Sequence, residues 1–159
     1  MLIQVEIASF AVDPSRNSPL IILKEISGDR ALPVPIGPLE ASAIAIESLK
    51  VTPDKPLTID LLKIILEQLN GTLNRVVIYD LVDQSLLARL QVINQNTMIF
   101  IDCRPCDAIA LAMRCEAPIF VQDCVFDKSS PEKISEKDKL RRNIASIDTT
   151  EFGRYFLES

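Results

Sequence analysis

Two segments of this chain repeat one pattern at places where a strand should lead into a helix. Pro38-Leu-Glu-Ala-Ser-Ala-Ile-Ala and Pro105-Cys-Asp-Ala-Ile-Ala-Leu-Ala both read Pro-x-acid-Ala-x-Ala-x-Ala. Proline is favoured at the first helical position, because no intrahelical partner exists there for the N–H that it lacks. The pattern therefore predicts two helices that start alike, and it indicates a duplicated unit.

Short apolar runs precede each of these helices and predict strands. Helical spacing also places a further helix between the two units, which Thr58 is expected to cap and Asn70-Gly71 to end. The predicted fold is α+β, with duplicated strand-strand-strand-helix units, an additional middle helix and C-terminal helices. The expected strands are 1–10, 20–26, 31–36, 73–81, 86–93, 98–102 and 119–121, and the expected helices are 38–49, 58–69 and 105–115.

The chain divides into a body and a charged tail. Residues 1–126 are predicted to form one domain, and residues 127–159 a charged helical tail that docks on it. Asp148 and Glu151 have the spacing of a capping box, and Phe152, Tyr155 and Phe156 would provide the docking contacts.

Charge and composition limit the functions that are open. No apolar run approaches the ~20 residues of a membrane-spanning helix, and no export signal is visible, so we expect a cytoplasmic protein with no membrane partner. The net charge of −5 argues against non-specific attraction to nucleic acid, so a nucleic-acid role needs local basic groups or a bridging metal. The sequence contains no His, which leaves carboxylates, Lys, Arg, Tyr or Cys for any catalysis.

The second junction carries the residue types needed for metal-assisted phosphodiester hydrolysis. Asp102, Arg104 and Asp107 offer two oxygen ligands and a forked donor for phosphate, at the end of a predicted strand. Asp60, in the first turn of the middle helix, is a further candidate. Glu40 and Asp107 each occupy the third position of a helix, however, where a carboxylate also stabilises the helix start without any catalytic role.

Four blocks of the sequence resemble the bifunctional nuclease domain family. They occur in the family's order and fall within residues 1–126. The blocks are Pro35-Ile-Gly-Pro-Leu-Glu-Ala, Lys55-Pro-Leu-Thr-Ile-Asp-Leu-Leu, Ile101-Asp-Cys-Arg-Pro-Cys-Asp-Ala-Ile-Ala-Leu-Ala and Ala117-Pro-Ile-Phe-Val. The resemblance implies an α+β fold, cleavage of DNA and RNA, and self-association as a homo-oligomer.

The resemblance also implies which residues form a site. Matched by position, the family's functional residues fall on Glu40, Asp60, Asp102, Arg104 and Asp107. We expect a divalent metal, Mg²⁺ or Mn²⁺, held by Asp102, Asp107 and Glu40, with Arg104 stabilising phosphate charge. The chain departs from the family at Ile59, where His usually precedes the Asp.

Two other functions remain open at this point. In a non-catalytic oligomeric binding or regulatory module, the same acids would cap helices and Arg104 would bridge elements or subunits. In a thiol-disulfide redox protein, Cys103-Arg-Pro-Cys106 would use the helix start to lower a thiol pKa, although these cysteines also suit packing positions.

Overall fold

The computed structural model describes residues 1–13, 16–49 and 54–129, which form a seven-stranded sheet with helices packed against it. The strand order is β3-β2-β1-β7-β4-β5-β6. The strands are β1 (Leu2–Asp13), β2 (Ser18–Glu25), β3 (Ala31–Pro35), β4 (Gly71–Val82), β5 (Ser85–Asn94), β6 (Thr97–Cys103) and β7 (Ile119–Gln122). The helices are α1 (Pro38–Ser48), α2 (Thr58–Gln68), α3 (Pro105–Cys115) and α4 (Asp123–Ser129).

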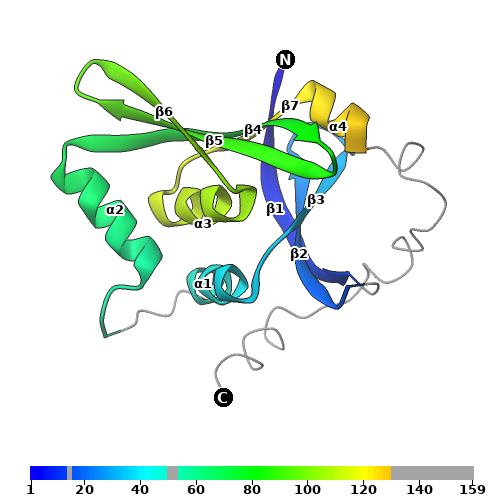
Figure 1. The fold of residues 1–159 in the computed structure, drawn as a ribbon, viewed down its shortest axis with the longest axis horizontal. Coiled ribbons are helices and arrows are strands. Elements are labelled where there is room, and N and C mark those ends of the chain that lie inside the picture. Colours follow the sequence, from blue (N-terminus) through cyan, green and yellow to red (C-terminus); the bar gives the residue numbers. More distant parts are fainter. Residues whose placement is uncertain (14–15, 50–53, 130–159) are drawn as a thin grey trace.

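The sheet joins two groups of three antiparallel strands through a short central strand. β7 pairs antiparallel with β1 and parallel with β4, so it links the first group to the second. Figure 1 shows the two groups crossing at a steep angle, with α1, α2 and α3 on one side of β4, β5 and β6. The α+β class is confirmed, and the order of elements repeats before and after α2, while common ancestry of the two halves stays a prediction.

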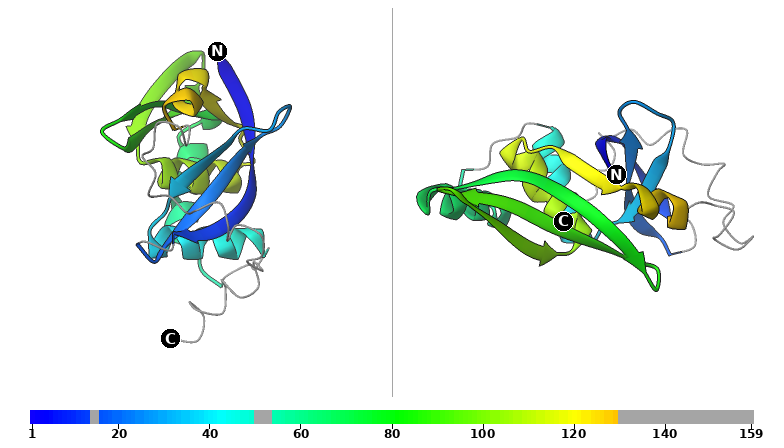
Figure 2. Two further views of the ribbon diagram at one scale, coloured as in Figure 1. Left: turned by 90° about the vertical axis from the view of Figure 1, so that its right-hand side faces the viewer. Right: turned by 90° about the horizontal axis from the view of Figure 1, so that it is seen from above.

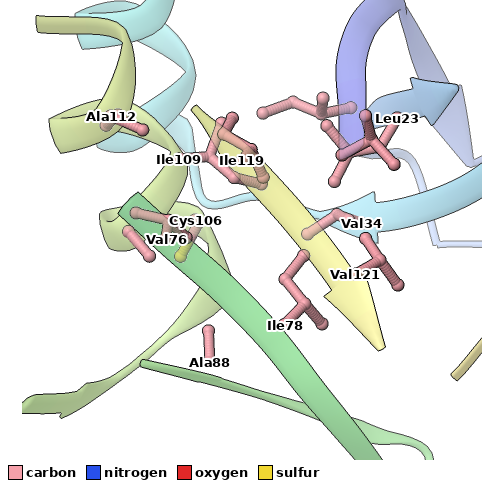
Figure 3. Close-up of a cluster of buried hydrophobic side chains, with 14 of the residues drawn as sticks. Leu23, Val34, Val76, Ile78, Ala88, Cys106, Ile109, Ala112, Ile119 and Val121 are labelled. Atoms are coloured by element: carbon pink, nitrogen blue, oxygen red, sulfur yellow. The ribbon is translucent and has the colours of Figure 1, made fainter. Parts of the chain in front are cut away.

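Buried aliphatic side chains fill the space between the sheet and the helices. Figure 3 shows residues of both strand groups and α3 meeting in one cluster, among them Leu23, Val34, Ile78 and Ile109. Four alanines of the repeated pattern lie at this contact, namely Ala41, Ala108, Ala110 and Ala112, and Ala41, Ala108 and Ala112 are fully buried. Small side chains allow the helices to approach the sheet and each other closely. The right-hand view of Figure 2 shows α1 and α3 next to each other.

The helices begin and end at the residue types that the sequence predicted, except at the start of α2. Pro38 and Pro105 are the first residues of α1 and α3, as predicted, and Asn70 adopts a left-handed φ of 57° after α2. Thr58 does not cap α2, because it is already the first helical residue. Instead, the carboxylate of Asp60 accepts a 2.8 Å hydrogen bond from the N–H of Leu57.

The last described helix spans the predicted boundary between body and tail, and the division itself stays a prediction. α4 runs across residue 126, and Phe126 is buried in the core with Val125. The predicted tail from residue 130 onward, including its docking aromatic residues, lies outside the described residues. Within the part of the chain that the structure describes, no helix is long and apolar enough to span a bilayer.

Candidate functional site

The N-termini of α1 and α3 lie side by side and bring three predicted residues together. Arg104 precedes α3 and donates from Nη2 to Glu40 Oε1 at 2.6 Å, across to the first turn of α1. It also donates from Nε to Asp107 Oδ2 at 2.7 Å and from Nη2 to Asp107 Oδ1 at 2.9 Å. Arg104 therefore bridges two carboxylates that are 64 and 3 residues away in sequence.

The two helices run in the same direction. Glu40 and Arg104 join their N-terminal ends, while Arg114 Nη1 donates to Glu47 Oε2 at 2.7 Å near their C-terminal ends. The positive ends of both helix dipoles consequently meet where Glu40 and Asp107 lie. Such a place favours negative groups, whether carboxylates of the protein or a phosphate from solution.

The same location could hold a cation. One ligand atom from each of Glu40, Cys106 and Asp107 lies within 4.8 Å of the others. The two carboxylates are hard oxygen donors of the kind that Mg²⁺ and Mn²⁺ prefer. Burial raises the pKa of the Cys106 thiol, and the Asp107 charge raises it further, so the thiol is protonated in the metal-free protein. The donor set fits a hard divalent cation bound through two carboxylates.

Access to this cluster comes from the solvent side. Glu40 is largely covered, with 16% of its side chain exposed, whereas Arg104 is 68% exposed. The Glu40 carboxylate lies over Gly37, and a Cβ at that position would overlap its Oε2. The φ of Gly37 is −80°, which any residue can adopt. The glycine is therefore needed because it has no Cβ, and not because of its backbone conformation. The hydrogen bonds to Asp107 and the charges of both acids raise the pKa of Arg104, which remains a cation.

Asp102 does not lie with these residues. Its carboxylate accepts hydrogen bonds from Arg89 Nε at 2.6 Å and Arg89 Nη2 at 3.3 Å, and Asp102 pairs directly with Arg89 in the sheet. Directly paired residues project from the same face. The neighbouring pair, Cys103 with the buried Ala88, faces the core, so Asp102 projects from the opposite face. The hydrogen bond from Arg89 lowers the pKa of Asp102.

The contacts of Asp60 stabilise the helices, and Asp60 does not contact the Arg104 cluster. It is buried, it caps α2 through Leu57, and it forms an ion pair with Arg114 of α3. Ile59, at the position where the resembled family usually has His, is a partly buried residue packed against the core. The structure thus brings together Glu40, Arg104 and Asp107, and leaves Asp102 and Asp60 elsewhere.

Burial acts against the redox interpretation of Cys103 and Cys106. It raises the pKa of Cys103 to about 11, and the Asp107 charge adds to this effect. The pKa of Cys106 is also raised, and both cysteines are free. A reactive thiol needs a lowered pKa, so the helix start does not activate either residue.

Sequence reasoning missed the arginine clamps of this helix layer. Arg114 and Glu47 were not singled out, although the repeated pattern contained a signal for them. Arg114 stands in the last turn of the helix that Arg104 precedes, and Glu47 near the end of the helix that contains Glu40. Because α1 and α3 run side by side, an ion pair between their first turns makes a second ion pair between their last turns sterically feasible.

These features define a class of α+β protein in which two parallel helices begin beside each other and gather carboxylates around an arginine. The chain belongs to the bifunctional nuclease domain family, whose model matches residues 21–133. It is similar to the uncharacterized protein MT1877 of Mycobacterium tuberculosis strain CDC 1551, with 34% identity over 156 residues, covering 98% of this chain and 93% of that protein. The uncharacterized protein Rv1829 of strain H37Rv is similar to the same extent.

Proposed function

We propose that this protein is a metal-assisted nuclease that hydrolyses phosphodiester bonds of RNA, DNA or both. One observation carries the proposal: Glu40 and Asp107 converge with Arg104 where two helix N-termini meet. The family supports the reaction class, since it is described as a nuclease domain. We place the protein in the cytoplasm, where nucleic acid is available as substrate.

Each residue of the cluster has a distinct role in this proposal. Glu40 and Asp107 would hold one Mg²⁺ or Mn²⁺ ion, which binds well to one or two carboxylates together with a substrate phosphate. When bound, such an ion polarises the phosphate and lowers the pKa of a coordinated water. Arg104 binds the phosphate oxygens and stabilises the charge that develops on them. The two helix N-termini stabilise the same negative charge.

Cleavage of single-stranded RNA and DNA in Mg²⁺ or Mn²⁺ tests this proposal. Asp107→Asn and Arg104→Ala are expected to lose about 100-fold in rate, comparable to removing one preorganised charge-stabilising group. Asp29→Asn changes an equally charged but fully exposed acid on the turn between β2 and β3, and it should cleave like the wild type. Chelation of the metal should stop cleavage. Equal cleavage by wild type and both site variants would identify a contaminating nuclease and refute the site.

Direct Mn²⁺ binding separates the two candidate positions of the metal. Glu40→Gln and Asp107→Asn should weaken Mn²⁺ binding about tenfold, whereas Asp102→Asn should change it less than about twofold. Electron paramagnetic resonance of free Mn²⁺ provides the measurement. A loss with Asp102→Asn as large as with Asp107→Asn would place the ion on the other face of the sheet.

A non-catalytic oligomeric binding module is the second candidate, and two observations favour it. Arg104 already forms ion pairs with both Glu40 and Asp107, as expected for a bridge between helices. α2 also exposes an apolar face, with Leu61, Ile65 and Leu69 each 47% or more exposed. In this interpretation a second copy of the chain covers α2. Self-association without metal-dependent cleavage would favour this candidate over the nuclease.

A further inference from the structure

The face of the sheet opposite α1, α2 and α3 carries arginines and aromatic residues in neighbouring positions. The strand register fixes which residues share that face, because directly paired residues project together. Phe120 of β7 pairs with Val77 of β4, which pairs with Arg89 of β5. Further along the strands, Arg75 pairs with Gln91, which pairs with Phe100 of β6. We call this surface the outer face.

The arginines stack on the aromatic rings of the outer face. The Arg75 guanidinium carbon lies 5.6 Å from the centre of the Phe120 ring. The Arg89 carbon lies 4.8 Å from the Tyr79 ring centre and 5.8 Å from that of Phe100. Planar guanidinium groups and aromatic rings both present surfaces on which nucleic-acid bases stack. α1, α2 and α3 lie on one side of β4, β5 and β6 (Figure 1), and the strand register places these arginines and rings on the opposite side.

A shallow hollow of about 180 Å³ lies on the outer face beside Tyr79 and Arg89. It is lined by Leu2, Val77, Tyr79, Arg89, Gln91 and Gln122. Glutamine amides both donate and accept hydrogen bonds, as the edges of unpaired bases require. Phe100 is 56% exposed on the edge strand β6, so one aromatic surface is open to a ligand.

The charge of the outer face differs from that of the whole chain. The chain carries −5, but Arg75 donates to the neutral Gln91 at 2.6 Å, and no ion pair joins it to an acid among the described residues. Arg89 is balanced by Asp102. The outer face therefore contributes one uncompensated cation beside three aromatic rings. Such a surface suits a ligand that binds through stacking of its rings more than through contacts to its phosphates.

We propose that the outer face binds single-stranded nucleic acid, with bases stacked on Phe100, Phe120 and the arginines. The proposal rests on the proposed function for its choice of ligand, and it assigns the substrate as single-stranded. Bases inside a duplex are already stacked on each other and cannot use these side chains. The four strands from β7 to β6 provide a width of roughly 14 Å, sufficient for two or three bases.

The outer face leads to the Arg104 cluster around the end of β6. Asp102 projects from the outer face, and Arg104, two residues later, binds Glu40 and Asp107 on the helix side. Two residues of extended chain span roughly 7 Å. A strand held on the outer face can therefore place the next phosphate at Arg104 without crossing the sheet.

Binding of a fluorescein-labelled 12-nucleotide oligouridylate, measured by anisotropy in EDTA, tests the proposal without cleavage. Phe100→Ala should weaken binding about tenfold, the loss of one stacked base, and Phe100→Trp should restore it. Arg75→Gln should weaken binding a few-fold and reduce the slope of log K against log salt by about 0.7. Lys55→Gln removes the same charge from an exposed loop before α2 and should leave binding unchanged.

The outcomes separate this proposal from the nuclease site. Glu40→Gln and Asp107→Asn should lose cleavage but still bind the oligonucleotide, and a wild type that binds the oligonucleotide without cleaving it refutes only the nuclease. Absence of binding by the wild type overturns the outer-face proposal. So does binding that is insensitive to both Phe100→Ala and Arg75→Gln, or tighter binding of a duplex. A change of oligomeric state in Phe100→Ala, with no change in oligonucleotide binding, would overturn it in favour of a contact with a second copy of the chain.

Discussion

Cys103 and Cys106 flank Arg104 but have a different role from it. Cys103 faces the core opposite Ala88, and Cys106 is buried in the cluster of Figure 3. Because burial disfavours the thiolate, the pKa of Cys103 is raised to about 11. At neutral pH both residues therefore act as small apolar groups that fill space behind the site.

The raised pKa of Cys103 makes the stability of the protein depend on alkaline pH. An unfolded cysteine ionises at about pH 8.5, whereas Cys103 in the fold keeps its proton until about 11. The folded state therefore binds more protons between these values, and the stabilisation present below the unfolded pKa is lost as the pH rises through the folded one. Urea unfolding from pH 8 to 11 should show this loss in the wild type and a smaller one in Cys103→Ser.

Alkylation provides an independent check on Cys103. At pH 8.5 the folded thiol should react roughly 100-fold more slowly than the same thiol in urea, because only the thiolate is a nucleophile. The exposed Cys124 serves as the internal control and should react readily in both conditions. Fast alkylation of folded Cys103 at neutral pH would contradict its burial and reopen the redox interpretation.

The helix positions of the candidate site residues follow local rules that can be read from the sequence, whereas the contacts between these residues depend on long-range pairing. Proline at the first helical position correctly placed Glu40 and Asp107 at the third. Asp102 and Arg104 look adjacent in sequence, but the alternation of β6 turns Asp102 toward Arg89, and only the β5 and β6 register identifies that partner. No local signal shows that Glu40 and Asp107 would meet, because their meeting depends on the packing of α1 against α3.

At the scale of elements, α3 is held between α1 and α2 by one arginine. Arg114 pairs with Glu47 of α1 and with Asp60 of α2, and its carbonyl accepts a 3.2 Å hydrogen bond from Lys63. Asp60 also caps α2, so one buried carboxylate stabilises a helix start and a helix contact. The clamp fixes the helix layer that positions the Arg104 cluster at the opposite ends of α1 and α3.

Arg114→Met should destabilise the fold by about 2 to 3 kcal/mol, because it leaves a buried carboxylate without its cation. The substitution retains an apolar stem, and the carboxylate concerned is that of Asp60. Glu67→Gln removes an exposed ion pair within α2, to Lys63. Its loss should be smaller, about 0.3 to 0.5 kcal/mol, as for other exposed pairs on a helix surface. Chemical denaturation gives both values, and similar losses for the two variants would show that Arg114 is a surface residue in solution.

The elements themselves were largely predictable, and their arrangement was not. Apolar runs and turn residues located all seven strands within a few residues, and helical spacing together with the prolines at two helix starts and Asn70-Gly71 at one helix end located α1, α2 and α3. The position of β7 between β1 and β4 could not be read from sequence, since such a short strand is specified by its neighbours rather than by its own pattern. α4 was missed because so short a helix shows too little helical periodicity.

At the scale of the whole molecule, three surfaces have different properties. The Arg104 cluster is charged, the outer face is aromatic and basic, and α2 is apolar. α2 packs against α3 and β4 through a few residues, of which Leu66 is partly buried against the core. Its outward residues are all more than 40% exposed, and they are Leu61, Leu62, Ile64, Ile65 and Leu69. A contiguous apolar surface of this kind marks an interaction site.

Self-association through α2, which the second candidate function proposes, gives a prediction for the intact chain. Burying one Leu or Ile side chain contributes about 1.5 to 3 kcal/mol, and a symmetric contact uses each side chain twice. Ile65→Glu places a charge in the centre of the contact, so sedimentation velocity should show an oligomer for the wild type and a monomer for the variant. Glu67→Gln, on the same helix, should remain oligomeric. Because the outer face with Phe100 lies on the side of the sheet opposite α2, the Ile65→Glu monomer should keep its oligonucleotide affinity. A monomeric wild type, or loss of affinity on dissociation, would show that the three surfaces do not act independently.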